Sequence, residues 1–82
     1  MEHVVVERAF EQPYTINEIN SIHRKFAWCL EQNRVRLIQS YLSLDRKRMI
    51  CIYEAPDAES VRRINQQSGF PCNCIWTASV LR

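Results

Sequence analysis

A carboxylate, a thiol and a phenol stand in two strongly apolar segments of the chain, and they are the side chains with the clearest chemical potential. Glu7 lies in residues 4–10, whereas Cys51 and Tyr53 lie in residues 49–54. A soft thiolate and a hard carboxylate both bind divalent transition metals, and a histidine such as His3 would complete a site acceptable to nickel, zinc or copper. These residue types predict a metal site, provided that the fold brings them to one surface.

Each candidate ligand also has a purely structural interpretation, and both interpretations stay open at this stage. A free cysteine such as Cys51 packs well as a small hydrophobe, and Glu7 could pair with a basic residue such as Arg36 across a dimer. His3 lies near a chain terminus, where fraying is common. Because site affinities generally rise toward copper, the residues alone do not single out nickel.

Six short elements would have to position these groups. High strand propensity marks residues 4–10, 35–44, 49–54 and 73–81 as strands. A capping box formed by Thr15 and Glu18 begins a helix that ends near residue 32, and a second helix runs from Asp57 to Gly69. This order predicts an α+β fold, the ferredoxin-like βαββαβ sandwich, whose four-stranded antiparallel sheet carries both helices on one face.

The other face of that sheet is expected to be open. Strand alternation assigns Val4, Val6, Ile50 and Ile52 to the helix side, and assigns to the open face His3, Val5, Glu7, Met49, Cys51 and Tyr53, extended by Leu37, Gln39 and Tyr41. Residues 1–82 form one small domain, and a domain of this size buries only roughly 60 to 65% of its unfolded-chain surface. We therefore expect a homodimer in which a second copy covers the open face.

Composition excludes several classes of function. A net charge of +2 is too small a bias to indicate nucleic acid or membrane binding, and residues 48–53 lack the glycine and alternating aromatics of an RNA-binding third strand. The sequence has neither a long apolar run nor a signal-peptide pattern, which favours a cytoplasmic location. The four cysteines are then expected as free thiols or ligands, and packing is the favoured role for Cys72 and Cys74.

Four segments together resemble a known family: Val-Glu-Arg-Ala-Phe at 6–10, Ser-Tyr at 40–41, Cys-Ile-Tyr-Glu-Ala-Pro-Asp at 51–57 and Gly-Phe-Pro at 69–71. They are similar to the small bacterial nickel-binding proteins of ferredoxin-like fold, a family otherwise catalogued as a domain of unknown function. The resemblance implies a dimeric α/β barrel and, for some members, a transition-metal site. The basic turn at 45–48 and the segment Cys72-Asn73-Cys74 depart from the family's pattern.

These observations predict a metal-binding protein that holds a divalent transition metal, nickel by the resemblance, on the open face of a homodimer. The predicted ligands are Cys51, Glu7 and His3, and Tyr53 and Tyr41 are expected to contact whatever occupies the cavity. The alternative is a small dimeric-barrel enzyme of the cofactor-independent monooxygenase or isomerase type, with Glu7, Tyr41 or Tyr53 as acid–base groups. The chain has no recognisable set of nucleophile, base and orienting group, which favours binding over catalysis.

Overall fold

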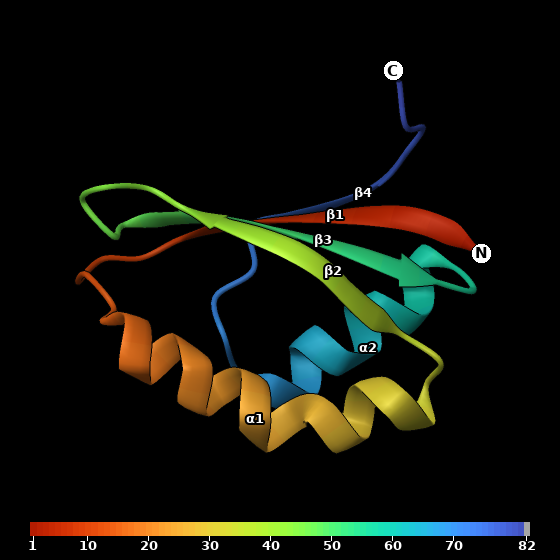
Figure 1. The fold of residues 1–82 in the computed structure, drawn as a ribbon, viewed down its shortest axis with the longest axis horizontal. Coiled ribbons are helices and arrows are strands. Elements are labelled where there is room, and N and C mark those ends of the chain that lie inside the picture. Colours follow the sequence, from red (N-terminus) through yellow and green to blue (C-terminus); the bar gives the residue numbers. More distant parts are fainter. Residues whose placement is uncertain (82) are drawn as a thin grey trace.

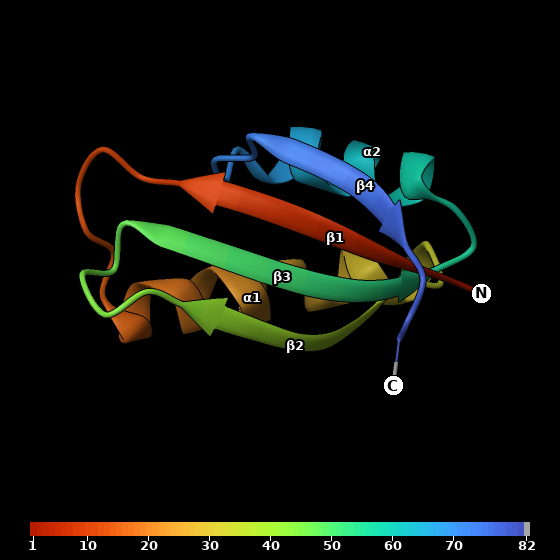
Figure 2. The same ribbon diagram turned by 90° about the horizontal axis from the view of Figure 1, so that it is seen from above.

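The structure, a computed structural model, describes residues 1–81 and contains the predicted elements in the predicted order. They are β1 (Glu2–Ala9), α1 (Ile16–Gln32), β2 (Arg36–Leu42), β3 (Arg48–Ala55), α2 (Ala58–Ser68) and β4 (Cys74–Ala78). The strands form one antiparallel sheet in the order β2-β3-β1-β4, and both helices cover the same face of it (Figures 1 and 2). The fold is the predicted ferredoxin-like α+β sandwich. Within residues 1–81, no helix has the length and apolar character needed to span a membrane.

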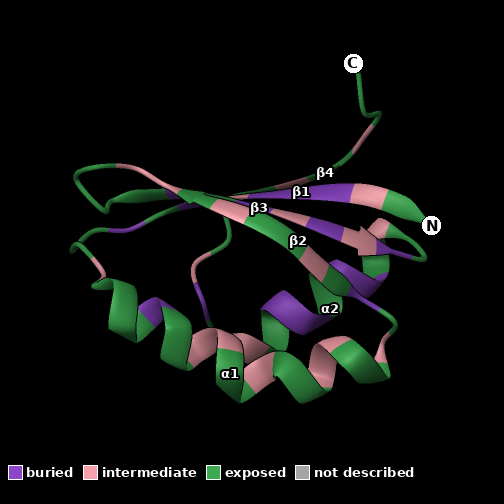
Figure 3. Ribbon diagram, in the orientation of Figure 1, coloured by how far each residue is buried: buried purple, intermediate pink, exposed green. Residues whose placement is uncertain are grey.

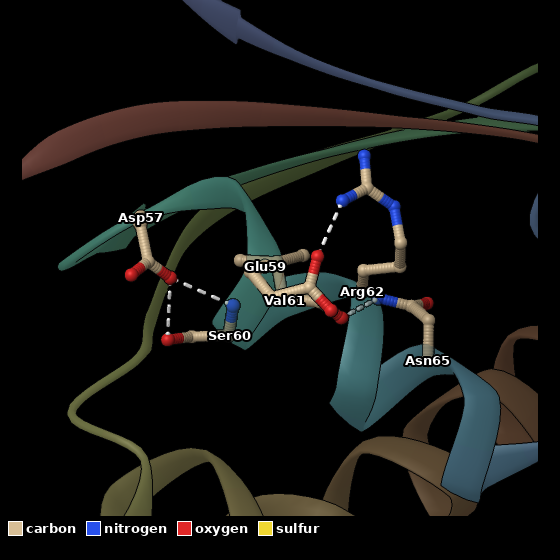
Figure 4. Close-up of polar contacts among 6 residues, drawn as sticks. All are labelled: Asp57, Glu59, Ser60, Val61, Arg62 and Asn65. Atoms are coloured by element: carbon tan, nitrogen blue, oxygen red, sulfur yellow. Dashed lines mark hydrogen bonds and ion pairs between the residues drawn. The ribbon is translucent and has the colours of Figure 1, made fainter.

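Both helices begin and end at the residues that the sequence indicates. The amide of Glu18 donates to Oγ1 of Thr15 at 3.1 Å, and the Thr15 amide donates to Oε1 of Glu18 at 2.9 Å, which completes the capping box. At the start of α2, Oδ1 of Asp57 accepts from both the amide and the hydroxyl of Ser60 at 2.8 Å (Figure 4). Gly69 follows α2 with φ of 69°, the left-handed conformation that favours glycine.

The core lies between the sheet and the helices, as the buried segments in Figure 3 show. α1 contributes one buried residue to the core, Ile19, and α2 contributes Val61 and Ile64, whereas the strands and loops supply the rest. At one end of the molecule Phe10 packs against Tyr14 and Phe70, with ring centroids 4.6 and 5.4 Å away. These aromatic contacts join the start of the β1–α1 loop to the segment that follows α2.

The predicted phase of β3, that is, which of its alternating residues face the helices, is wrong. Cys51 lies opposite Val6 and Tyr53 lies opposite Val4, and residues that face each other across an antiparallel pair project to the same side. Cys51 and Tyr53 therefore project toward the helices, together with Met49. Ile50 lies opposite Glu7 on the open face. Residues 49–53 are apolar at nearly every position, so their alternation carries no information about which set is buried.

The phase of β2 changes at an irregularity in the strand. The pairing with β3 shifts between Leu37 and Gln39, so Leu37 lies opposite Tyr53 on the helix side whereas Gln39 lies opposite Ile52 on the open face. Tyr41 lies opposite Ile50 and is exposed. The prediction for the open face is confirmed for Gln39 and Tyr41 and is wrong for Leu37.

Candidate functional site

Polar side chains gather on both faces of the sheet, and the sheet itself separates the two groups. The helix-side cluster consists of Arg8, His23, Ser40, Cys51 and Tyr53. The open face is the surface that carries Val5, Glu7, Tyr41, Ile50 and Trp76. Because Glu7 belongs to one group and Cys51 to the other, the predicted placement of both ligands on one face is wrong.

Arg8 anchors the helix-side cluster. Its side chain is buried, with the residue 4% exposed. Nη1 donates to the carbonyl oxygen of Pro71 at 3.0 Å, Nη2 donates to the hydroxyl oxygen of Tyr53 at 3.2 Å, and the guanidinium lies 4.5 Å from the ring centroid of Phe70. Among residues 1–81 no carboxylate forms an ion pair with Arg8, and its Nε has no hydrogen-bond partner. A buried cation of this kind favours an anion beside it.

Cys51 is the group that can supply that negative charge. The hydroxyl of Ser40 donates to its sulfur at 3.4 Å. Burial raises the pKa of Cys51, but interaction with the His23 side chain, the positive charge of Arg8 and the hydrogen bond from Ser40 lower it more strongly, to about 7. Burial and the neighbouring Cys51 charge raise the pKa of Tyr53 to about 12, so the phenol keeps its proton.

On the open face, Glu7 is held by a hydrogen bond that the sequence did not indicate. The indole Nε1 of Trp76 donates to Oε2 of Glu7 at 2.8 Å. The register between β1 and β4 places Cys74 directly opposite Glu7, and it places His3 opposite Ala78. Cys74, rather than Cys51, is thus the thiol that shares a face with Glu7. The pairing register of β4 would have revealed this, but a five-residue strand gives too little alternation to set a register.

A pocket of about 400 Å³ lies at the hairpin end of the open face. Its wall includes Glu7, Tyr41, Arg48, Ile50 and Asn73. The hydroxyl of Tyr41 also forms a hydrogen bond with the side-chain amide of Gln39. Tyr41 therefore lies on the open face and contributes to the wall of this pocket, whereas Tyr53 is buried on the helix side of the sheet and is not in a position to contact an occupant of this pocket.

The residues that the structure describes do not complete a metal cluster within one chain. Within residues 1–81, no group of three or more His, Cys, Asp and Glu side chains converges closely enough to hold an ion. His3 and Glu7 project from the same face of β1, but four residues of a strand span about 13 Å, so one ion does not reach both in one chain. The open face supplies one close pair of donors, Glu7 and Cys74.

The structure is that of a small ferredoxin-like α+β protein with a carboxylate and a thiol opposite each other on the open face of its sheet. The family model described as nickel responsive protein SCO4226-like matches residues 5–77, and the chain belongs to this family. The crystal structure of SCO4226 from Streptomyces coelicolor A3(2) has the same fold, with a TM-score of 0.85 and 18% sequence identity over 98% of this chain and 99% of that chain. None of the curated proteins matches the sequence.

Proposed function

We propose that this protein binds a divalent transition metal, nickel in the first instance, on the open face of a homodimer. The observation that carries the proposal is the pairing of Glu7 with Cys74 on that face, where a carboxylate and a thiol lie directly opposite each other. The two groups combine a hard and a soft donor, which suits an ion of intermediate character such as nickel. The description of the family as nickel responsive supports the same choice of metal.

The homodimer follows from the apolar surface that surrounds this pair. Trp76 is 46% exposed and Ile50 is 37% exposed, and Tyr41 adds a further exposed ring. The C-terminal segment rises from the same side of the sheet, and it carries the exposed side chains of Val80 and Leu81 (Figure 1). Contiguous exposed apolar surface of this kind marks an interaction site, and a second copy of the chain offers a matching surface.

Two-fold symmetry would supply the donor that one chain does not bring to Glu7. Val5 lies midway between His3 and Glu7 on β1. If the two sheets face each other, a two-fold axis that runs between them, over Val5 and perpendicular to β1, would place His3 of the partner subunit over Glu7. Each of two equivalent sites would then hold Glu7 and Cys74 from one subunit and an imidazole from the other.

Calorimetric titration of the untagged protein with Ni²⁺ tests this assignment. Glu7→Gln and Cys74→Ser should each weaken nickel binding at least tenfold, since each removes one ligand. Cys51→Ser should leave the affinity unchanged, because its sulfur lies on the helix side. Binding no tighter than millimolar, or a loss confined to Cys51→Ser, would overturn the open-face site; the latter would instead support an ion bound among the helices.

Light scattering coupled to size-exclusion chromatography tests the dimer. The wild-type protein should elute with about twice the 9.8 kDa mass of one chain. Ile50→Glu, which adds a charge to the open face, should convert it to the monomer, whereas Leu44→Glu on the exposed hairpin turn should not. A wild-type monomer at micromolar concentration would contradict the proposal.

We also propose a cytoplasmic location, since Cys29, Cys51, Cys72 and Cys74 are all free thiols.

A further inference from the structure

Two thiols lie exposed around the segment that connects α2 to β4. Cys72 precedes β4 and Cys74 is its first residue, with Asn73 between them. Both cysteines are free and exposed, so the packing role that the sequence favoured for them is wrong. Both also line a pocket of about 430 Å³ between α2 and β4. Two thiols that are neither buried nor joined to each other are available to a thiophilic ligand.

The backbone that carries these thiols is tied to β1 at three points. The Asn73 amide donates to the carbonyl oxygen of Glu7 at 2.9 Å, and Oδ1 of Asn73 accepts from the Ala9 amide at 2.8 Å. Arg8 donates to the carbonyl oxygen of Pro71 at 3.0 Å. The two cysteines are consequently attached to a segment that is ordered by the fold rather than by a ligand. Such preorganisation reduces the entropy that binding would otherwise cost.

The number of donors selects the kind of ion. In residues 1–81 no third His, Cys, Asp or Glu side chain joins a metal-sized group with these two sulfurs. Zinc requires about four ligands and nickel commonly four or more, whereas copper(I) has a filled d shell and is stable with two thiolates in a linear arrangement. Two thiolates around one copper(I) ion carry a net charge of −1. Arg62 lies on the wall of the same pocket and contributes a positive charge there, while its Nη1 also pairs with Oε2 of Glu59 at 2.8 Å.

We propose that Cys72 and Cys74 form a two-coordinate binding site for copper(I). Binding forms two copper–sulfur bonds and releases the two thiol protons to solvent, and no electron is transferred. The site shares Cys74 with the proposed nickel site but does not rest on it, because it uses no carboxylate, no histidine and no second subunit.

Anaerobic titration with copper(I), in competition with a chromophoric copper(I) chelator, tests the proposal on the untagged full-length protein. The protein should withdraw one copper ion per chain from the chelator. Cys72→Ser and Cys74→Ser should each weaken the affinity at least a hundredfold, whereas Cys29→Ser on α1 is the matched control and should not change it. X-ray absorption of the copper-loaded protein should show two sulfur ligands. An affinity that survives Cys72→Ser, or zinc bound as tightly as copper(I), would overturn the site.

A crossed set of variants separates this proposal from the proposed function. Glu7→Gln should weaken nickel binding and leave copper(I) binding unchanged, and Cys72→Ser should do the reverse. If nickel fails to bind the wild-type protein, the copper(I) titration still shows whether Cys72 and Cys74 bind copper(I). Substitutions at exposed positions usually change stability little, so Cys72→Ser should remain folded, and its thermal melt should match that of the wild-type protein.

Discussion

The two faces of strand β1 carry residues in different environments, although these residues alternate along the same eight positions. On the helix side, Arg8 is buried and engaged by Pro71, Tyr53 and Phe70. On the open face its neighbour Glu7 is partly exposed and held by Trp76. Adjacent residues of one motif therefore belong to separate sites. A motif identified in sequence order defines a site only once the phase of its strand is known.

Two of the thiols, Cys51 and Cys74, show the same contrast between the faces. Cys51 belongs to the family-like motif, yet it is fully buried and its sulfur contacts Ser40 near a guanidinium. Cys74 lies outside the motif, yet it is exposed and faces a carboxylate. A cationic neighbour stabilises a thiolate but repels a metal cation, whereas an anionic neighbour attracts one. The open face is accordingly the better place for a divalent ion.

Removal of Arg8 should have the largest effect, because it breaks the helix-side cluster at its centre. Arg8→Ala should lower the free energy of unfolding by roughly 3 to 5 kcal/mol, since it leaves the Pro71 carbonyl and the buried Cys51 charge without their partner. Arg8→Lys retains the charge but not the fork of donors, so its effect should be smaller. Urea denaturation measures both. Arg36→Ala, which breaks an exposed ion pair, is the control; a loss at Arg8 no larger than at Arg36 would contradict this assignment.

The next largest effect is expected in the pH dependence of stability, which the Cys51 thiol on the helix side should dominate. The folded-state pKa of Cys51 is about 7, below its ordinary value near 9, so ionisation of the thiol stabilises the folded protein. That contribution is fully present above pH 9 and is lost as the pH falls through 7. Between these limits the wild-type protein should gain roughly 1 to 3 kcal/mol relative to Cys51→Ser.

Urea denaturation at several pH values, with thiolate absorbance as a second readout on the folded protein, measures this difference. The groups that face the Cys51 sulfur are Arg8 from β1, His23 from α1, Ser40 from β2 and Tyr53 from its own strand. Tyr53 titrates near 12 and does not contribute below pH 9. Parallel stability curves for the two proteins would show that Cys51 is protonated at neutral pH.

Local signals in the sequence were sufficient to predict the fold, but not to predict which strand residues lie on each face of the sheet. The Thr15–Glu18 capping box, the Asp57 cap and Gly69 each act within a few residues, so the helices could be placed from sequence. The phase of β3 depends on which of two apolar sets the helices cover, and that is decided by tertiary packing. The shift in β2 and the register of Cys74 against Glu7 likewise depend on long-range pairing.

Two tyrosines provide a matched comparison of the two faces. Tyr53→Phe should lower the free energy of unfolding by about 1 to 2 kcal/mol, because it removes the buried hydrogen bond with Arg8. Tyr41→Phe removes an exposed hydroxyl and should change stability by less than ~0.5 kcal/mol. Any effect on binding in the open-face pocket should follow Tyr41. Thermal melts of both variants measure the stability losses, and ligand titrations measure the effects on binding. Equal stability losses would contradict the assignment of the two tyrosines to different faces.

A small effect is also expected at Glu54, which lies beside Tyr53 in sequence but projects from the opposite face of the sheet. Its Oε1 pairs with Nη2 of Arg36 at 3.3 Å, and the two side chains remain 30% and 70% exposed. Solvent and salt screen such a pair, so Glu54→Gln should cost roughly 0 to 1 kcal/mol, and the loss should diminish in high salt. Thermal melts at low and high ionic strength measure it. A loss above 2 kcal/mol that is insensitive to salt would place Glu54 among buried groups and contradict its assignment to the open face.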